Sequence, residues 1–252
     1  MTDSHERREL WRRCRQRGLV PGPEETESQF LARVARSVPT APLLHPMLVK
    51  HFEVAPDWLP IEYQSPQLRF WEGAATCIEG DPDGVLSVKI ELGYSLFLSP
   101  SDIVAHEALH AIRCGFSDSL LEELLAWKTC PTGWMRKVSM LSLDLVQALG
   151  ALTILLGLFF GLLFDEAFFH LIAILSASTL FVRTWKYSIA LHKAAQALEK
   201  IQLPSWPILL HLSWDEIKAL SCNPERFWSR FSEKSHFRFE FLHASFGMLR
   251  DN

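Results

Sequence analysis

Residues 99–112 read SPSDIVAHEALHAI, and the interpretation of the whole chain starts from this stretch. Ser99 suits a helix N-cap, Pro100 suits the first helical position, and Asp102 places a carboxylate in the first turn. No further proline or glycine follows until Gly115, where we expect the helix to stop. The pattern predicts one continuous helix between Pro100 and Gly115.

Two histidines lie four residues apart on this predicted helix. His106 and His110 fall one turn apart on the same face, so their imidazole nitrogens can bind one metal ion. Glu107 lies beside that face, where its carboxylate can take a proton from a water without being a ligand. The spacing predicts a site for one zinc ion per chain, with Glu107 as the general base.

A catalytic zinc site usually has a third protein ligand. The residues after His110 do not continue as His-x-x-Gly-x-x-His, which excludes a metzincin. Glu122 and Glu123 follow on a second predicted helix, residues 119–129, which Ser117 or Asp118 can cap. Because a short turn places two helices antiparallel, either carboxylate can return to the histidine face.

The motif, with its uncharged flanks, resembles the gluzincin group of zinc metallopeptidases. Gluzincins take a helical Glu as third ligand, often in the context Glu-x-x-Ala, and Glu123-Leu124-Leu125-Ala126 matches this context. The resemblance therefore implies Glu123 rather than Glu122, although gluzincin linkers are usually longer. The resemblance covers residues 85–130. It implies a peptide or protein substrate, and it implies that an extended substrate pairs with a strand within residues 85–98.

Two apolar runs predict a membrane hairpin. Residues 145–164 form a run without ionisable side chains, and this run is long enough to cross a bilayer. Residues 167–182 form a shorter uncharged run. Asp165 and Glu166 separate the runs. The basic residues that flank the hairpin are Arg136, Lys137, Arg183 and Lys186. The positive-inside rule then predicts a cytoplasmic metal site and cytoplasmic termini; two buried helices of a soluble core are the alternative.

The remaining segments give an α+β architecture. Residues 68–78 and 85–92 have the pattern of two strands joined by the turn at 79–84. Six prolines between Pro39 and Pro66 favour an extended connection without regular structure. The predicted segments are N-terminal helices and a proline-rich connection (1–66), a zincin-like metal-binding domain (67–137), a transmembrane hairpin (138–186) and a helical cytoplasmic tail (187–252).

The composition and charge of the chain argue against several other classes of protein. The net charge of −4 and the scattered basic residues argue against nucleic acid as a partner. Five widely spaced cysteines indicate reduced thiols rather than a disulfide framework. The charged N-terminus lacks the apolar core of a signal peptide. The partners expected are therefore a peptide or protein substrate and the lipid bilayer, and the sequence does not indicate an oligomeric state.

Two other classes of function stay open. Glu107-x-x-His110 and Glu240-x-x-His243 are two Glu-x-x-His pairs, as in ferritin-like di-iron proteins. The further carboxylates of such a site would be Glu122 or Glu123 and Glu27 or Glu199. The other class is a non-catalytic membrane scaffold that zinc stabilises. Arg113 is expected in a surface salt bridge, with binding of a substrate carboxylate or an oxyanion as the alternative.

Overall fold

A computed structural model describes residues 4–63, 68, 74–93, 99–130, 145–164, 167–234 and 236–247. Its elements are α1 (Ser4–Gln16), α2 (Glu27–Arg36), α3 (Pro46–Phe52), β1 (Ile61–Tyr63), β2 (Ala74–Gly80), β3 (Leu86–Leu92), α4 (Pro100–Ile112), α5 (Ser119–Ala126), η1 (Trp127–Thr129), α7 (Leu145–Phe164), α8 (Ala167–Lys200), α9 (Ser205–Leu209), α10 (Trp214–Cys222), α11 (Pro224–Lys234) and α12 (His236–Phe246). The protein is largely helical with one small sheet, which confirms a mixed helix-and-sheet fold.

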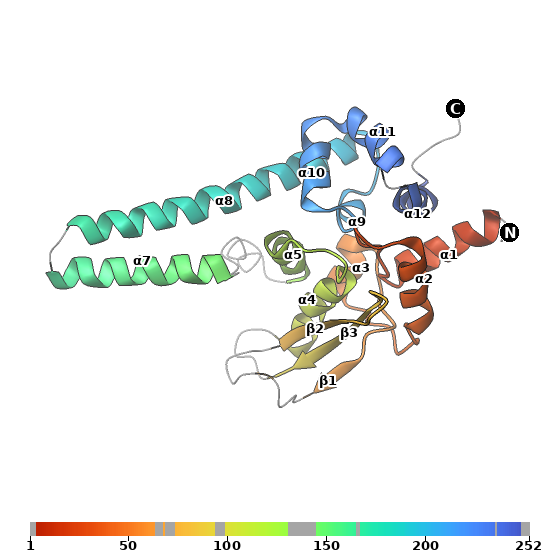
Figure 1. Ribbon diagram of the computed structural model, residues 1–252, viewed down its shortest axis with the longest axis horizontal. Coiled ribbons are helices and arrows are strands. Elements are labelled where there is room, and N and C mark those ends of the chain that lie inside the picture. Colours follow the sequence, from red (N-terminus) through yellow and green to blue (C-terminus); the bar gives the residue numbers. More distant parts are fainter. Residues whose placement is uncertain are drawn as a thin grey trace.

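The sheet has three strands in the order β1-β3-β2. β2 and β3 form the expected antiparallel hairpin, in register from Ala74 opposite Leu92 to Gly80 opposite Leu86. The turn holds Gly84 at φ 74°, a backbone conformation that favours glycine. β1 adds to the other edge of β3 in parallel. α4 contacts β2 and β3, so the sheet supports the helix that carries the two histidines (Figure 1).

The ends of α4 follow from its sequence. The Ser99 side chain accepts a hydrogen bond from the backbone N–H of Asp102, as the N-cap pattern predicts. The helix ends at Ile112, and Gly115 serves a different purpose from the one expected. A Cβ on Gly115 would lie 2.9 Å from the Cα of Gly22, so glycine is required for close backbone packing.

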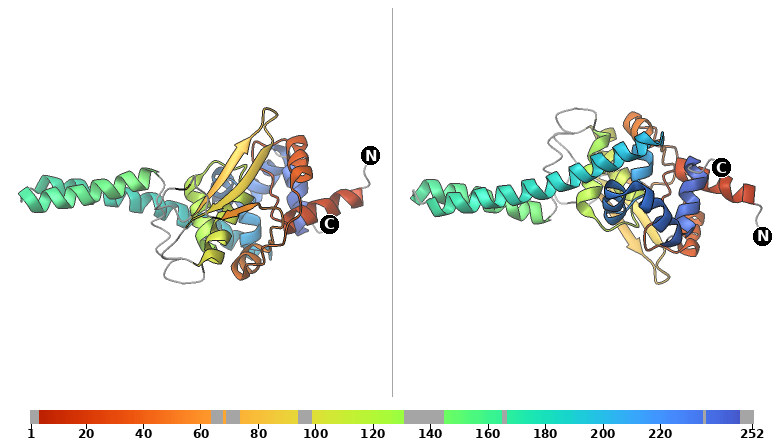
Figure 2. Two further views of the ribbon diagram at one scale, coloured as in Figure 1. Left: turned by 90° about the horizontal axis from the view of Figure 1, so that it is seen from below. Right: turned by 90° about the horizontal axis from the view of Figure 1, so that it is seen from above.

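Helices from both ends of the chain share one core with α4. Trp11 of α1, Phe30 of α2 and Phe241 of α12 pack with ring centroids 5.6–5.8 Å apart. All three side chains are buried, and they belong to the same hydrophobic cluster as Leu109. α1 and α12, the first and last helices, therefore lie side by side at one end of the molecule (Figure 2). The metal helix thus packs in one body with segments that are distant in sequence.

The proline-rich connection is more regular than expected. α3 and β1 both lie between Pro39 and Pro66, so the prediction of an extended segment without regular structure is wrong. Pro46 occupies the first turn of α3, where its missing N–H costs nothing. Leu48 and Phe52, four residues apart, are fully buried and fix the helix to the core. Tertiary packing thus outweighs the local proline content.

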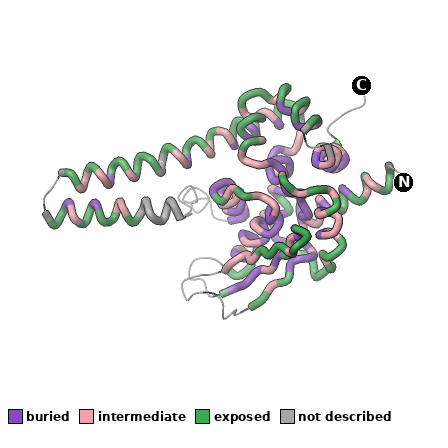
Figure 3. The backbone as a smooth tube through the Cα atoms, viewed as in Figure 1, coloured by how far each residue is buried: buried purple, intermediate pink, exposed green. Residues whose placement is uncertain are grey.

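α7 and α8 extend together away from the body (Figures 1 and 3). They pack closely because Gly157 and Gly161 face α8: a Cβ on Gly157 would lie 2.8 Å from the carbonyl oxygen of Phe169. This small-xxx-small spacing is typical of helices that pack within membranes. The connecting residues 165–166, and the flanking residues 131–144 with Arg136 and Lys137, lie outside the described residues.

The extended helices expose apolar side chains. Among the described residues, one helix, Phe168–Lys200, is long and apolar enough to cross a membrane, and Leu152–Leu163 is a shorter apolar stretch. Only 12% of the most apolar window of the longer helix is buried. Two buried helices of a soluble core are therefore not what the structure contains. α8 is continuous, so its second half, with Leu198 fully buried, joins the core of the body.

Candidate metal centre

α4 and α5 bring three side chains from the sequence prediction together. His106 Nε2 and His110 Nε2 lie 3.3 Å apart. Glu123 Oε2 lies 3.5 Å from His106 Nε2, and Glu123 Oε1 lies 3.4 Å from His110 Nε2. The six residues between α4 and α5 suffice to return the second helix to the histidine face. In the described part of the chain, these residues form the one group with the side chains and spacing to hold a metal ion.

The spacing of the two histidine nitrogens fits a tetrahedral ion. Ligands about 2.0–2.1 Å from a tetrahedral zinc ion lie roughly 3.3–3.4 Å from one another. His106 Nε2 and His110 Nε2 lie 3.3 Å apart, close to that value, and each nitrogen has a different oxygen of Glu123 within 3.5 Å. Two imidazole nitrogens and one carboxylate are also a ligand set that zinc prefers. The residues present therefore fit a zinc ion with His106, His110 and Glu123 as ligands.

Glu122 occupies a different position from Glu123. Its Oε2 lies 3.6 Å from Nδ1 of His110, on the side of the ring away from the other two ligands. A carboxylate beside the second nitrogen of a histidine ligand holds the proton there and orients the ring. The geometry therefore favours Glu123 as the third ligand and Glu122 as a residue that positions His110.

The centre carries a surplus of negative charge. Burial opposes a charge on His110, but the carboxylates of Glu122 and Glu123 outweigh it and raise the pKa of His110 to about 10. Burial also opposes the ionised form of Glu123, yet hydrogen bonds from His106 and His110 hold its pKa well below the usual range. Without a metal, the centre therefore takes up a proton on His110 at neutral pH.

Glu107 lies beside the ligands and is held by the sheet. Thr76 of β2 donates a hydrogen bond to Glu107 Oε2 at 2.7 Å, and its hydroxyl also lies 3.0 Å from the backbone oxygen of Glu107. The charge of Glu107 contributes to the raised pKa of His110, so the carboxylate acts on the ligand cluster. Thr76 leaves Glu107 Oε1 without a hydrogen bond to the described residues.

Trp127 is a site residue that the sequence reasoning missed. Its Nε1 donates to Glu123 Oε2 at 3.1 Å, and its ring packs edge-on against His106 with centroids 5.0 Å apart. Trp127 follows Glu123 by four residues, so helical spacing alone could have indicated it. Thr76 has no such signal, because only the fold brings β2 to α4. His106 Nδ1 is buried without a hydrogen-bond partner among the described residues, so packing rather than a second carboxylate orients this ring.

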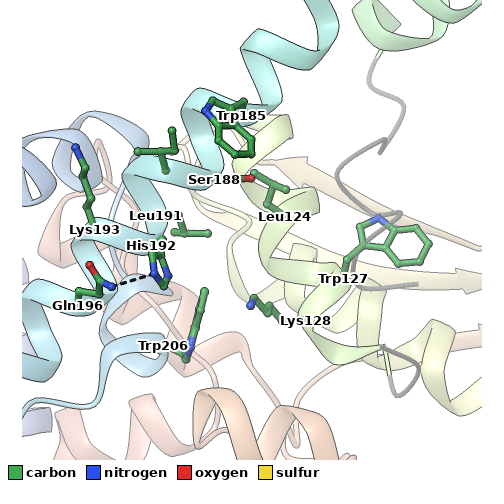
Figure 4. Close-up of a pocket in the computed structure, with 11 residues that line it drawn as sticks. Leu124, Trp127, Lys128, Trp185, Ser188, Leu191, His192, Lys193, Gln196 and Trp206 are labelled. Atoms are coloured by element: carbon green, nitrogen blue, oxygen red, sulfur yellow. Dashed lines mark hydrogen bonds between the residues drawn. The ribbon is translucent and has the colours of Figure 1, made fainter. Parts of the chain in front are cut away.

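A mostly apolar cavity lies on the α8 side of α5. It has a volume of about 490 Å³ and lies between the segment Leu124–Lys128 and α8 (Figure 4). Leu124, Trp185 and Trp206 contribute apolar surface to it. The side chains of the candidate metal ligands do not line this cavity.

The strand beside the site differs from the one expected. From the sequence, we expected a substrate to pair with a strand in residues 85–98. Ile90–Leu92 of β3 is instead hydrogen-bonded to a strand on each side, β1 and β2, so these residues have no free edge. Residues 94–98 lie outside the described residues. Within the sheet that the structure describes, β2 is an edge strand and packs on α4, and it carries Thr76 against Glu107. An extended peptide near Glu107 would therefore meet β2 rather than the centre of the sheet.

Arg113 is not at the surface. It is fully buried, and its Nη1 donates to the carbonyl oxygens of Leu210 at 2.6 Å and Leu212 at 3.1 Å. Burial lowers the pKa of Arg113 to about 10. The guanidinium also lies 3.9 Å from the ring centroid of Phe116. The expected surface salt bridge is therefore wrong, and Arg113 ties the end of α4 to the segment after α9.

The second Glu-x-x-His pair lies elsewhere. Glu240 of α12 pairs with Arg7 at 2.9 Å, and Glu27 pairs with the same arginine at 2.8 Å. Glu199 accepts a hydrogen bond from Ser205. None of these carboxylates belongs to the cluster of His106, His110 and Glu123. The fold therefore does not assemble the di-iron site that the two pairs suggested.

Comparisons of the chain with models of protein families, with curated proteins and with solved structures find no match. The resemblance to gluzincins therefore stays a prediction, and the residues of α4 and α5 carry it.

Proposed function

We propose that this chain is a membrane-anchored zinc metallopeptidase that cleaves peptide bonds with Glu107 as general base. The observation that carries the proposal is the cluster of His106, His110 and Glu123, in which the two histidine nitrogens lie 3.3 Å apart and each has an oxygen of Glu123 within 3.5 Å. A structural zinc site usually has four protein ligands, whereas a catalytic site has three and leaves one position open. The three side chains here match the catalytic pattern.

The chain's own residues would divide the chemistry as follows. Zinc, when bound, acts as a Lewis acid and makes a water acidic near neutral pH. Glu107 would take a proton from a water as its oxygen bonds to the peptide carbonyl carbon, and would return that proton to the amine nitrogen as the C–N bond breaks. Thr76 holds the Glu107 carboxylate in place through the 2.7 Å hydrogen bond. Trp127 fixes the Glu123 carboxylate through its indole N–H.

The surroundings favour an extended peptide. Among the described residues, β2 offers a strand edge beside Glu107, which suits an extended backbone. A substrate would then lie along β2 with its scissile bond beside Glu107.

The anchor in this proposal is a transmembrane hairpin formed by α7 and α8. Apolar side chains such as Leu155, Leu162 and Phe168 are 64%, 80% and 63% exposed, which water does not favour over such a length. Arg183 and Lys186 follow the second apolar segment, so the positive-inside rule places the body and its metal centre in the cytoplasm.

Labelling of Cys222 tests this orientation. Cys222 is the exposed cysteine among the five, whereas Cys14, Cys114 and Cys130 are buried and Cys77 is half-buried. We expect a membrane-impermeant maleimide to label Cys222 only after cells are permeabilised, with Cys222→Ser as the control. Labelling of Cys222 in intact cells would place the body outside.

Replacement of the general base tests the peptidase. Purified full-length protein, loaded with zinc, is assayed on fluorescein-labelled casein and on a quenched random peptide library. Glu107→Gln should keep its zinc and lose hydrolysis by about 10²- to 10⁴-fold. Glu225→Gln, a change at an exposed position of α11, is the matched control and should leave both unchanged.

Two outcomes would contradict the proposal. Full hydrolysis by Glu107→Gln would remove Glu107 from the mechanism. A wild-type protein that holds zinc but cleaves neither probe would instead support the non-catalytic scaffold stabilised by zinc.

A further inference from the structure

A groove of about 610 Å³ lies where α8 enters the body, between α8 and α10. It is separate from the cavity beside the metal centre, because the two are lined by different residues of α8. Figure 1 shows α10 against α8 at this junction. The groove therefore lies at the boundary between the exposed apolar helix and the folded body.

The lining of the groove changes character along α8. Leu175, Val182 and Lys186 lie seven and four residues apart, so they share one face of the helix. Leu175 and Val182 are 58% and 47% exposed and lie toward the apolar end. Lys186 lies at the body, about 16 Å from Leu175 at the rise of an α-helix. One face thus runs from apolar to basic over a distance comparable to a lipid chain.

A rigid aromatic wall closes the basic end. Tyr187 of α8 stacks on Trp214 of α10, with centroids 3.8 Å apart and planes 5° from parallel. The Tyr187 hydroxyl donates to Asp118 Oδ2 at 3.0 Å, and Asp118 also caps α5. The wall is therefore fixed by contacts on both sides of α8.

The basic end carries more positive than negative charge. Arg183 and Lys186 of α8 and Lys218 of α10 all line the groove. Asp215 forms an ion pair with Lys218 at 2.6 Å, and its side chain is 88% exposed. Glu216, the other acid of α10, faces away and pairs with Arg238 at 2.6 Å. In the described part of the groove, Lys186 and Lys218 thus face one carboxylate, that of Asp215, which leaves one positive charge for an anionic group.

We propose that this groove binds one anionic phospholipid, with its chains along Leu175 and Val182 and its phosphate beside Lys186 and Lys218. The apolar-to-basic order matches the order of chain and headgroup in such a lipid, and basic groups at a membrane surface favour anionic lipids. The inference rests on the proposed membrane insertion of α8 and is independent of the metal chemistry.

Lipid retention by the full-length protein tests the groove. The protein is reconstituted in nanodiscs of phosphatidylcholine with a minority of phosphatidylglycerol, and the lipids kept after release are counted by native mass spectrometry. We expect the wild type to retain phosphatidylglycerol in preference to phosphatidylcholine. Lys186→Gln with Lys218→Gln should lower that preference, by roughly fivefold for each charge.

Two matched variants sharpen the result. Lys193→Gln with Lys200→Gln removes the same charge from exposed positions of α8 outside the groove, and should leave the preference unchanged. Lys186→Arg with Lys218→Arg keeps the charge and should also keep the preference. Equal lipid retention by the groove variant and the Lys193/Lys200 control would overturn the proposal.

Extraction of membranes with alkaline carbonate separates the two proposals. If the wild type stays in the membrane but shows no preference for phosphatidylglycerol, the groove proposal alone is wrong. If carbonate releases the wild type, the membrane insertion is wrong, and the groove proposal falls with it.

Discussion

Two clusters of polar side chains in the body of this protein, one buried and one half-buried, differ in how their charges are matched. Arg33 and Glu25 have side chains only 2% and 5% exposed and form two hydrogen bonds of 2.7 and 2.8 Å. Arg33 also donates to the carbonyl oxygen of Val20. His106, His110 and Glu123 instead keep their facing atoms 3.3–3.5 Å apart. The first cluster is closed, and the second has the spacing of ligands around an ion.

The difference is the one expected if an ion belongs between the side chains of the second cluster. A charge-assisted hydrogen bond draws its atoms to about 2.7–2.9 Å, as in the pair of Arg33 and Glu25. Ligands of a shared ion stay farther apart because the ion lies between them. The raised pKa of His110 also favours a metal centre, because a proton on His110 supplies the positive charge that a metal ion would otherwise bring to the carboxylates. Zinc should therefore affect the second cluster and leave the first unchanged.

The largest effect on folding is expected at the closed cluster. Arg33→Met leaves Glu25 buried without its partner and should lower the free energy of unfolding by about 3–5 kcal/mol. Zinc content should not change in the protein that folds. Urea unfolding and metal analysis measure the two quantities. Adding Glu25→Gln to Arg33→Met should recover most of the stability, and a double variant as unstable as the single one would contradict the unpaired charge as the cause.

The metal cluster should respond strongly to pH. The pKa of His110 is raised above its ordinary value of 6.5 to about 10, so zinc displaces a proton from His110 at neutral pH. Zinc affinity should therefore rise with pH, about tenfold per unit below pH 10. In the metal-free protein, the same shift stabilises the fold fully below pH 6.5, and this contribution is lost as pH rises through 10.

Isothermal titration of zinc in two buffers of different ionisation enthalpy measures the released proton. Glu122→Gln should weaken the pH dependence, because Glu122 is one of the two carboxylates that raise the pKa of His110. Zinc binding without proton release between pH 6.5 and 8 would contradict the protonated centre.

A smaller effect is expected from the residue that holds the general base. Thr76→Val removes the hydrogen bond to Glu107 and nearly preserves the volume. We expect kcat/KM to fall by roughly tenfold, because one hydrogen bond to a charged group contributes about 1.5 kcal/mol. Zinc content should stay at the wild-type value. Thr76→Ser keeps the hydroxyl and should recover most of the activity, so an inactive Thr76→Ser protein would argue against the hydrogen bond.

The smallest effect is expected at Trp127. Trp127→Phe removes the N–H that Glu123 accepts but keeps an aromatic ring against His106. Zinc affinity should fall by roughly threefold to tenfold, since one net hydrogen bond contributes about 1 kcal/mol. Competition with a fluorescent zinc chelator measures this change. Unchanged affinity would indicate that Trp127 only packs against the centre.

Local patterns predict the part of the site that lies on consecutive helical turns. The cap at Ser99, the shared face of His106 and His110, and the return of Glu122 or Glu123 to that face follow from spacing within residues 99–126, and the Glu-x-x-Ala resemblance pointed to Glu123. Contacts between distant segments leave no such pattern. Thr76 reaches Glu107 across the hairpin, and Arg113 reaches Leu210 across nearly a hundred residues. Composition therefore suggested a surface position for Arg113, whereas the fold buries it.

Zinc content tests the central claim most directly. The full-length wild type and His106→Ala are purified, exposed to zinc, passed through a desalting column and analysed for metal by mass spectrometry. The ligand geometry predicts one zinc ion per wild-type chain and none in His106→Ala. Equal zinc content in the two proteins, or a wild type that retains no zinc, would contradict a metal centre at His106, His110 and Glu123.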